Sequence, residues 1–158
     1  MSWPVLYETP VLREWIDYNG HMNLAYYVLV FDRGTDGLLD RLGIGERYRA
    51  ATGRTIYVVE AHLTYASEAK EGEPLAVETL LVGADEKRLH VFHRMLRGRG
   101  GPLVATNELL CLHVDQAGPK AAPFDAAARE RIDALLAEQR REARPPELGR
   151  AIALRRAR

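Results

Sequence analysis

The alternation of apolar and polar positions predicts one long helix early in the chain. Residues 24–42 carry apolar side chains at the i, i+3, i+4 spacing of an α-helix, and the first two turns are apolar on nearly every side. Asn23 can cap this helix, and Gly43 and Gly45 can end it. Because a helix that is apolar on several sides must be buried, we expect a sheet to curl around it.

Strand patterns lie on both sides of this helix in the sequence. Residues 4–13 alternate weakly before it, and four longer segments follow it at 55–67, 75–83, 89–97 and 103–115. Since the later segments are joined by short turn-forming links, we expect an antiparallel meander. A last amphipathic helix begins after the cap residue Asp125 and stops at Pro145-Pro146. The order predicts an α+β fold with about five strands and a C-terminal helix.

Charge is distributed unevenly along the 158 residues. The 22 Lys and Arg balance the 22 Asp and Glu, but residues 140–158 hold seven Arg and two Glu, which leaves 15 basic and 20 acidic side chains in residues 1–139. We therefore predict a single domain over 1–139 and a basic tail over 140–158. Ile152 and Leu154 allow the tail to dock as a short helix, and a solvated extension is the alternative. The overall balance argues against a nucleic-acid-binding domain.

Other composition signals narrow the class of protein. The single Cys111 cannot form an intrachain disulfide, and no basic-then-apolar leader opens the sequence, so we expect a cytoplasmic protein. The longest apolar run, 24–31, is too short to cross a bilayer. The sequence lacks metal-ligand spacings, glycine-rich phosphate loops and a Gly-x-Ser-x-Gly elbow. We therefore expect no metal, no cofactor and no serine nucleophile.

The most informative segment is 17–23, which reads Asp-Tyr-Asn-Gly-His-Met-Asn and directly precedes the long helix. A helix start offers unpaired N–H groups and a positive partial charge, which can hold a carbonyl oxygen as it gains negative charge. Gly20 lets the backbone approach a ligand closely, and His21 can move a proton near neutral pH. Asp17 or Asn19 can orient the imidazole or position a water.

The pattern Asp-x-Asn-x-His-x-Asn ahead of a long apolar helix resembles the hotdog-fold acyl thioesterases, both the 4-hydroxybenzoyl-CoA thioesterase-like and the acyl-ACP thioesterase-like kinds. This resemblance implies a curved antiparallel sheet around the helix and active sites at the interface of a dimer. It implies Asp17, Asn19 and His21 as catalytic residues. A further catalytic acid, Glu68, is implied by the pattern Leu-x-Tyr-x-x-Glu at 63–68.

The predicted reaction is hydrolysis of an acyl-CoA thioester to a free acid and coenzyme A, with water activated by His21 or by Asp17. The candidates for substrate binding are Gly20, Met22, Asn23, Tyr27, Arg94 and Arg97. The first three would offer backbone amides to the carbonyl oxygen, and the tyrosine would form a wall of the acyl pocket. The two arginines would meet the phosphates of coenzyme A.

Several alternatives stay open at this level. A non-hydrolytic hotdog module that binds acyl thioesters or builds an oligomer is the rival function. The carrier can be coenzyme A or a carrier protein, and water can attack directly or after a covalent anhydride forms. Similar motifs occur in thioesterases of carnitine and betaine metabolism, so a short or cationic acyl group is one possibility. We expect a homodimer, which can pair further into a dimer of dimers. Glu60 and His62 share a strand face and either line a cleft or face solvent.

Overall fold

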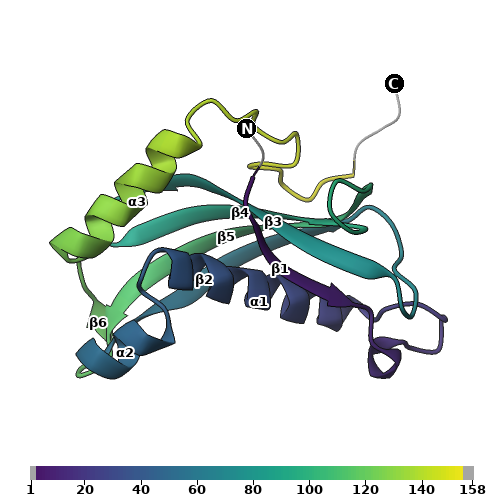
Figure 1. Ribbon diagram of the computed structural model, residues 1–158, viewed down its shortest axis with the longest axis horizontal. Coiled ribbons are helices and arrows are strands. Elements are labelled where there is room, and N and C mark those ends of the chain that lie inside the picture. The colour runs from purple at the N-terminus through teal and green to yellow at the C-terminus, as the bar shows by residue number, and fades with distance from the viewer. Residues whose placement is uncertain (1–2, 155–158) are drawn as a thin grey trace.

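The computed structural model describes residues 3–154, and its antiparallel sheet curls around one long helix (Figure 1). The strands are β1 Val5–Pro10, β2 Arg54–Tyr65, β3 Pro74–Ala84, β4 Arg88–Leu96, β5 Leu103–Asp115 and β6 Lys120–Ala121. The helices are α1 Leu24–Arg41, α2 Glu46–Thr52, α3 Ala126–Glu138 and the 3₁₀ turn η1 Arg13–Trp15. The predicted α+β hotdog architecture is confirmed, whereas α2, η1 and the two-residue β6 were not predicted.

The long helix α1 lies very close to the sheet because two of its residues have no side chain. A Cβ atom added to Gly34 would lie 2.6 Å from a methyl carbon of Val77, and one added to Gly37 would lie 2.6 Å from the carbonyl oxygen of Leu6. The predicted cap is present, since the Asn23 side chain accepts a hydrogen bond from the Ala25 amide. This contact fixes where α1 begins, directly after the segment 17–23.

The strand order is β1-β3-β4-β5-β2, with β6 added beside β5. The predicted meander is therefore correct for β3, β4 and β5 but wrong for β2, which pairs with β5 and not with β3. Arg54 faces Asp115 at one end of this pairing, and Tyr65 faces Ala105 at the other. Residues 66–73 consequently cross the end of the sheet to reach β3. This crossing brings the link to the start of α1.

The helix α3 ends at Glu138, earlier than the prolines predict. The next residue, Gln139, is buried, and its side chain completes the free part of the β3 edge beyond β1. Its carboxamide oxygen accepts from the Leu81 amide at 2.8 Å, and its nitrogen donates to the Thr79 carbonyl at 2.8 Å. The Gln139 side chain thus pairs two backbone groups of this edge that no neighbouring strand reaches.

The C-terminal segment after α3 runs over the sheet face that is opposite to α1 (Figure 1). Leu148 packs against the cluster formed by Trp3, Leu80 and Phe92. The Gly149 amide donates to a carboxylate oxygen of Glu108 at 2.7 Å. The docked part of the tail is thus a turn and not a helix through Ile152 and Leu154, which are both exposed and lie outside regular secondary structure. Residues 155–158 of the predicted tail lie outside the described residues.

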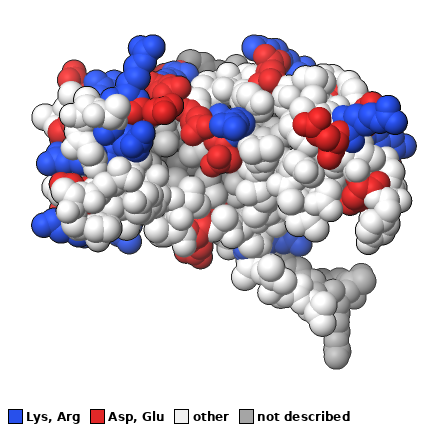
Figure 2. Space-filling model, turned by 90° about the horizontal axis from the view of Figure 1, so that it is seen from below, with Lys and Arg blue, Asp and Glu red and all other residues white. Residues whose placement is uncertain are grey.

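Charges on the α1 side of the molecule are mixed. Figure 2 shows acidic and basic side chains interspersed on this face, with broad uncharged surface between them.

Within the described residues, no helix is both long enough and apolar enough to cross a membrane.

Two buried histidines hold the interior of the sheet together. His93 on β4 lies between two threonines, with Nε2 3.0 Å from Thr35 Oγ1 and Nδ1 2.8 Å from Thr79 Oγ1. His113 on β5 donates from Nδ1 to the Ala122 carbonyl at 2.7 Å, and its Nε2 accepts from the Tyr48 hydroxyl at 2.9 Å. Both rings therefore have a partner on each nitrogen, as buried polar groups require.

Candidate active site

The segment 17–23 forms a tight turn whose shape is fixed by its own backbone. The Gly20 amide donates to the Asp17 carbonyl at 2.9 Å, and the Asp17 amide donates to the His21 carbonyl at 3.2 Å. Gly20 has a φ of 81°, which favours a residue without a side chain. The turn thereby presents the side chains of Asp17 and His21 beside the start of α1.

The Asp17 carboxylate is held by one hydrogen-bond donor on each oxygen. The Asn19 amide donates to Oδ1 at 2.8 Å, and the Asn23 side chain donates from Nδ2 to Oδ2 at 3.0 Å. These two hydrogen bonds, the one from the Asn19 amide first, lower the pKa of Asp17 below its ordinary value. Asp17 is therefore ionised at neutral pH and available as a base or nucleophile. Asn23 both caps α1 and orients this carboxylate.

The crossing link 66–73 brings Glu68 beside the turn. The Glu68 Oε2 atom lies 3.8 Å from Nε2 of His21. The link is held in place because the Met22 amide donates to the Ala69 carbonyl at 2.7 Å. His21 differs from the two histidines of the sheet interior, since its Nδ1 is buried and has no hydrogen-bond partner among residues 3–154. One ring nitrogen thus faces a carboxylate, and the other is a buried polar atom without a partner among these residues.

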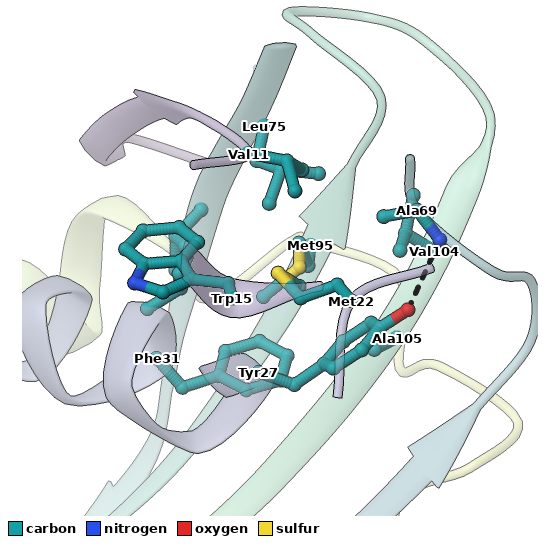
Figure 3. Close-up of a cluster of buried hydrophobic side chains, with 12 residues drawn as sticks. Val11, Trp15, Met22, Tyr27, Phe31, Ala69, Leu75, Met95, Val104 and Ala105 are labelled. Atoms are coloured by element: carbon teal, nitrogen blue, oxygen red, sulfur yellow. Dashed lines mark hydrogen bonds between the residues drawn. The ribbon is translucent and has the colours of Figure 1, made fainter. Parts of the chain in front are cut away.

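Tyr27 fastens the same link from the first turn of α1. Its hydroxyl accepts from the Ala69 amide at 3.1 Å, the contact drawn in Figure 3, and donates to the Ser67 carbonyl at 3.4 Å. Burial raises the pKa of Tyr27, so the hydroxyl stays protonated. From the other side, Arg97 donates to the Glu68 carbonyl at 2.7 Å and also pairs with Glu73. Arg97 therefore supports the link that carries Glu68 and does not line the groove beside it.

These residues surround a groove of about 340 Å³. Its lining consists of Asp17, Asn19, His21, Met22, Leu24, Tyr27, Tyr65, Ala66, Ser67 and Glu68. The four predicted catalytic residues lie in it together, and so do two of the predicted binding residues, Met22 and Tyr27. Leu24 and Tyr65 were not predicted as site residues, although Tyr65 stands in the motif at 63–68 that indicated Glu68.

The predicted backbone contacts to a carbonyl oxygen are altered by the structure. The Gly20 amide is bound within the turn, the Met22 amide donates to Ala69, and the Asn23 amide donates to the Trp15 carbonyl at 2.9 Å. None of these three amides is free to bind a substrate. The first amide of α1 is different, because the Leu24 N–H forms no hydrogen bond within residues 3–154. A developing negative charge at the helix start can therefore be met by Leu24.

The second predicted arginine, Arg94, contacts residues that do not line the groove. Arg94 lies on the opposite sheet face, where its Nε donates to Glu78 at 2.6 Å and its guanidinium stacks over the Trp3 ring at 4.3 Å. An arginine that is committed to a carboxylate and an indole has few donors left for phosphate. Side chains of β4 alternate between the two faces of the sheet. The position of Arg94 in the strand therefore does not by itself show that its side chain reaches the site.

A larger groove of about 740 Å³ lies on the opposite sheet face, between the sheet and residues 149–151. Glu60 and His62 line it, together with the pair His90 and Glu108, whose Nε2 and Oε1 atoms are 2.7 Å apart. It contains no residue of the segment 17–23. Among residues 3–154, no group of three or more His, Cys, Asp or Glu is arranged to hold a metal ion.

Comparison with known proteins agrees with this fold. Residues 11–132 match the model of the thioesterase-like superfamily. The betainyl-CoA thioesterase of Pseudomonas aeruginosa is 42% identical over 94% of this chain and 93% of its own. A candidate thioesterase from Pseudomonas putida KT2440 superposes with a TM-score of 0.85, at 35% identity over 99% of both chains. The protein SAV2348 of Staphylococcus aureus, solved with CoA, superposes with a TM-score of 0.90, at 27% identity over 98% of both chains.

The chain belongs to the thioesterase-like superfamily. The predictions of a hotdog-fold acyl thioesterase and of an enzyme that hydrolyses acyl-CoA thioesters are confirmed by these matches. The non-hydrolytic module proposed as the rival function is accordingly set aside. The roles of the individual site residues, the acyl group and the assembly are taken up below.

Proposed function

We propose that this acyl-CoA thioesterase hydrolyses betainyl-CoA, or a thioester with a similarly short cationic acyl group, in the groove at the start of α1. The observation that carries the proposal is the meeting of Asp17, His21 and Glu68 in one groove that Leu24, whose amide is unpaired, also lines. The betainyl-CoA thioesterase of Pseudomonas aeruginosa, 42% identical over nearly its whole length, supports the choice of acyl group.

In the proposed mechanism the thioester carbonyl oxygen accepts a hydrogen bond from the Leu24 N–H. Asp17, ionised and fixed by its two donors, removes a proton from a water that attacks the acyl carbon. The C–S bond then breaks, and the leaving sulfur takes up a proton, so the products are the free acid and coenzyme A. His21 supplies that proton, and the Glu68 carboxylate beside it holds the water. Asn19 orients Asp17 through its backbone amide.

The same carboxylate can instead attack the acyl carbon itself and form an anhydride, which water then opens. A single turnover in ¹⁸O-labelled water separates the two routes. Direct attack places the label in the product acid and leaves Asp17 unlabelled. The anhydride route places label in the Asp17 carboxyl group when water attacks its carbon, which mass spectrometry of the peptide that contains residue 17 detects.

The activity is tested by release of free thiol from a panel of short, aromatic, cationic and long-chain acyl-CoA thioesters. We expect the highest kcat/KM for the cationic acyl group. An acyl carrier protein thioester of the same acid tests the carrier, and slower hydrolysis of it is expected. Preference for a long-chain thioester over every short one would contradict the proposed acyl group while leaving the reaction class intact.

We further propose that two copies pair along β2. This strand is the last in the sheet order, and three consecutive apolar side chains are exposed on it: Tyr57 at 43%, Val58 at 46% and Val59 at 53%. A long apolar strand edge is an open template for another strand. Leu24 and Tyr65, exposed at 64% and 47%, lie at the groove beside this edge, so a second copy would close its mouth.

Sedimentation of the protein at micromolar concentration tests the pairing. We expect a dimer or a pair of dimers for the native chain and a monomer for Val59→Lys, because a charge cannot be buried at the paired edge without a partner. A monomeric native chain would contradict the proposal. We also retain as proposals the domain limits 1–139, the tail 140–158 and a cytoplasmic location, the last supported by the buried, unpaired Cys111.

A further inference from the structure

The lining of the groove is rich in negative charge and aromatic surface. It contains the carboxylates of Asp17 and Glu68 and the rings of Tyr27 and Tyr65, but no Lys or Arg. Lys70 approaches Glu68 from outside the lining, with Nζ 3.6 Å from Oε1, so these three charged side chains sum to one negative charge. Such a lining favours a cation over an anion near the reacting carbonyl.

The two tyrosines are held in fixed relation to the start of α1. Their ring centroids lie 5.1 Å apart, with the planes at 85°. The Tyr65 hydroxyl donates to the Leu24 carbonyl at 3.4 Å, which keeps the Tyr65 ring beside the residue whose amide is unpaired. Tyr27 is buried, whereas Tyr65 leaves 47% of its surface open. The Tyr65 ring is thus the aromatic surface that a ligand can reach.

The short distance between the nitrogen and the carbonyl carbon is the next constraint on the acyl group. In an N–C–C(=O) unit, the nitrogen and the carbonyl carbon are about 2.5 Å apart. A quaternary ammonium placed this close to a carbonyl bound at Leu24 must lie within the same groove. It has no N–H to donate, so hydrogen bonds cannot recognise it directly. The face of an aromatic ring, assisted by a nearby carboxylate, is the group that attracts such a cation.

We propose that Tyr65 selects the charge of the acyl group, with its ring against a quaternary ammonium, Tyr27 behind it and Glu68 supplying the field. This inference rests on the proposed function, since it concerns the acyl group of the same thioester. It assigns specificity to a residue that takes no part in breaking the C–S bond.

The test compares two thioesters of the same shape. Betainyl-CoA carries a trimethylammonium group, and 3,3-dimethylbutyryl-CoA carries a neutral tert-butyl group in its place. Their kcat/KM values are measured by thiol release, and their ratio cancels any effect that is common to both reactions. We expect the native enzyme to prefer the cation by at least about tenfold, and Tyr65→Leu to lower the ratio about three- to thirtyfold. Tyr65→Phe, which keeps the ring, should stay within about threefold of the native ratio.

Tyr57→Leu is the matched control, because Tyr57 is also exposed on β2 but does not line the groove. It removes a tyrosine from the same strand edge and should leave the ratio unchanged. Equal kcat/KM for the two thioesters in the native enzyme, or an unchanged ratio in Tyr65→Leu, would overturn the inference and leave the thioesterase reaction standing. If neither thioester released thiol, the proposed function would fail instead. The ratio of their dissociation constants, measured by calorimetry on the same variants, would then decide the role of Tyr65.

Discussion

Two histidines of this protein lie in contrasting surroundings, one in the turn before α1 and one in the middle of the sheet. His93 has a threonine hydroxyl on each ring nitrogen and is completely buried. His21 has a buried Nδ1 without a partner among residues 3–154 and an Nε2 that lies 3.8 Å from Glu68. The fully paired ring has no capacity left for chemistry, whereas the incompletely paired ring does. The hydrogen-bond partners, and not the residue type, separate a structural histidine from a candidate catalytic one.

The buried surroundings of His93 also change its affinity for a proton. Burial lowers the pKa of His93 to about 3, so its imidazole stays neutral through the physiological range. The arrangement is self-consistent, because Thr35 donates to the Phe31 carbonyl and can therefore accept from a proton on Nε2. Thr79 then donates to Nδ1. A ring with this fixed neutral tautomer contributes to packing and not to proton transfer.

The largest expected effect comes from the turn. We predict that His21→Ala and Asp17→Ala each lose at least about a hundredfold in kcat, because removing a general base or acid typically costs about 10²–10⁴ in rate. Thiol release gives kcat, and thermal unfolding checks that each variant remains folded. His62→Ala, a half-buried histidine on the opposite face, should keep native turnover. Full activity in both turn variants would contradict the site.

The reverse outcome is expected at the centre of the sheet. His93→Ala should lower the free energy of unfolding by about 2–4 kcal/mol, since it leaves a cavity and an unpaired threonine hydroxyl. Turnover per folded molecule should stay within a few-fold of native. Urea unfolding at pH 7 measures the first quantity and thiol release the second. A stable His93→Ala protein with a hundredfold loss of kcat would invert the comparison.

The pH dependence of stability gives an independent reading of His93. Its folded pKa lies below that of the unfolded chain, so the unfolded state binds the extra proton. Stability should therefore decrease as pH falls below about 6.5, by up to about 1.4 kcal/mol per pH unit, and level off below about 3. The part of the slope that is lost in His93→Ala is the contribution of this ring.

Asn23 connects the turn to the helix and should give a smaller, double effect. Asn23→Ala removes the helix cap, which costs about 1 kcal/mol of stability, and one of the two donors to Asp17. The lowered pKa of Asp17 should then rise. Because kcat/KM decreases as pH falls through that pKa, its decrease on the acid side should begin at a higher pH. Asn23→Ser keeps a cap but not the donor. This variant should show the same shift of the acid-side decrease in kcat/KM, with little loss of stability.

The smallest effect is expected on the opposite sheet face. His90 and Glu108 are paired there, but the histidine is partly exposed, and exposed pairs contribute about 0–1 kcal/mol. His90→Ala should leave kcat/KM within about twofold of native and change the unfolding temperature only slightly. A large loss of activity in this variant would show that the 740 Å³ groove takes part in the reaction.

Local sequence was sufficient for the elements that depend on near neighbours. The caps Asn23 and Asp125 accept hydrogen bonds from the helices that they were predicted to begin. Residues 103–115 form β5 with the predicted limits, and β3 and β4 differ by one residue at each end. Apolar spacing and capping act over a few residues, so they are readable without knowledge of the fold. The same holds for the turn 17–23, whose residue types indicate the site.

Contacts between distant segments were decided by the tertiary structure. The pairing of β2 with β5 sends residues 66–73 across the end of the sheet, and this places Glu68 beside His21. The family pattern indicated Glu68, but no spacing in the sequence gives that proximity. The bulge between Val58 and Glu60 likewise shifts which side chains of β2 face inward.

The sequence by itself determined a long buried helix, its cap and a turn with an acid, an imidazole and amides before it. The tertiary structure decided which groups of that turn remain free. The Met22 and Asn23 amides are taken by the carbonyls of Ala69 and Trp15, which leaves the Leu24 amide at the helix start. Arg94 faces Glu78 and Trp3 on the other side of the sheet. The physical reason is the same in each case, because a donor is available only when no distant acceptor reaches it, and the fold alone brings those acceptors into place.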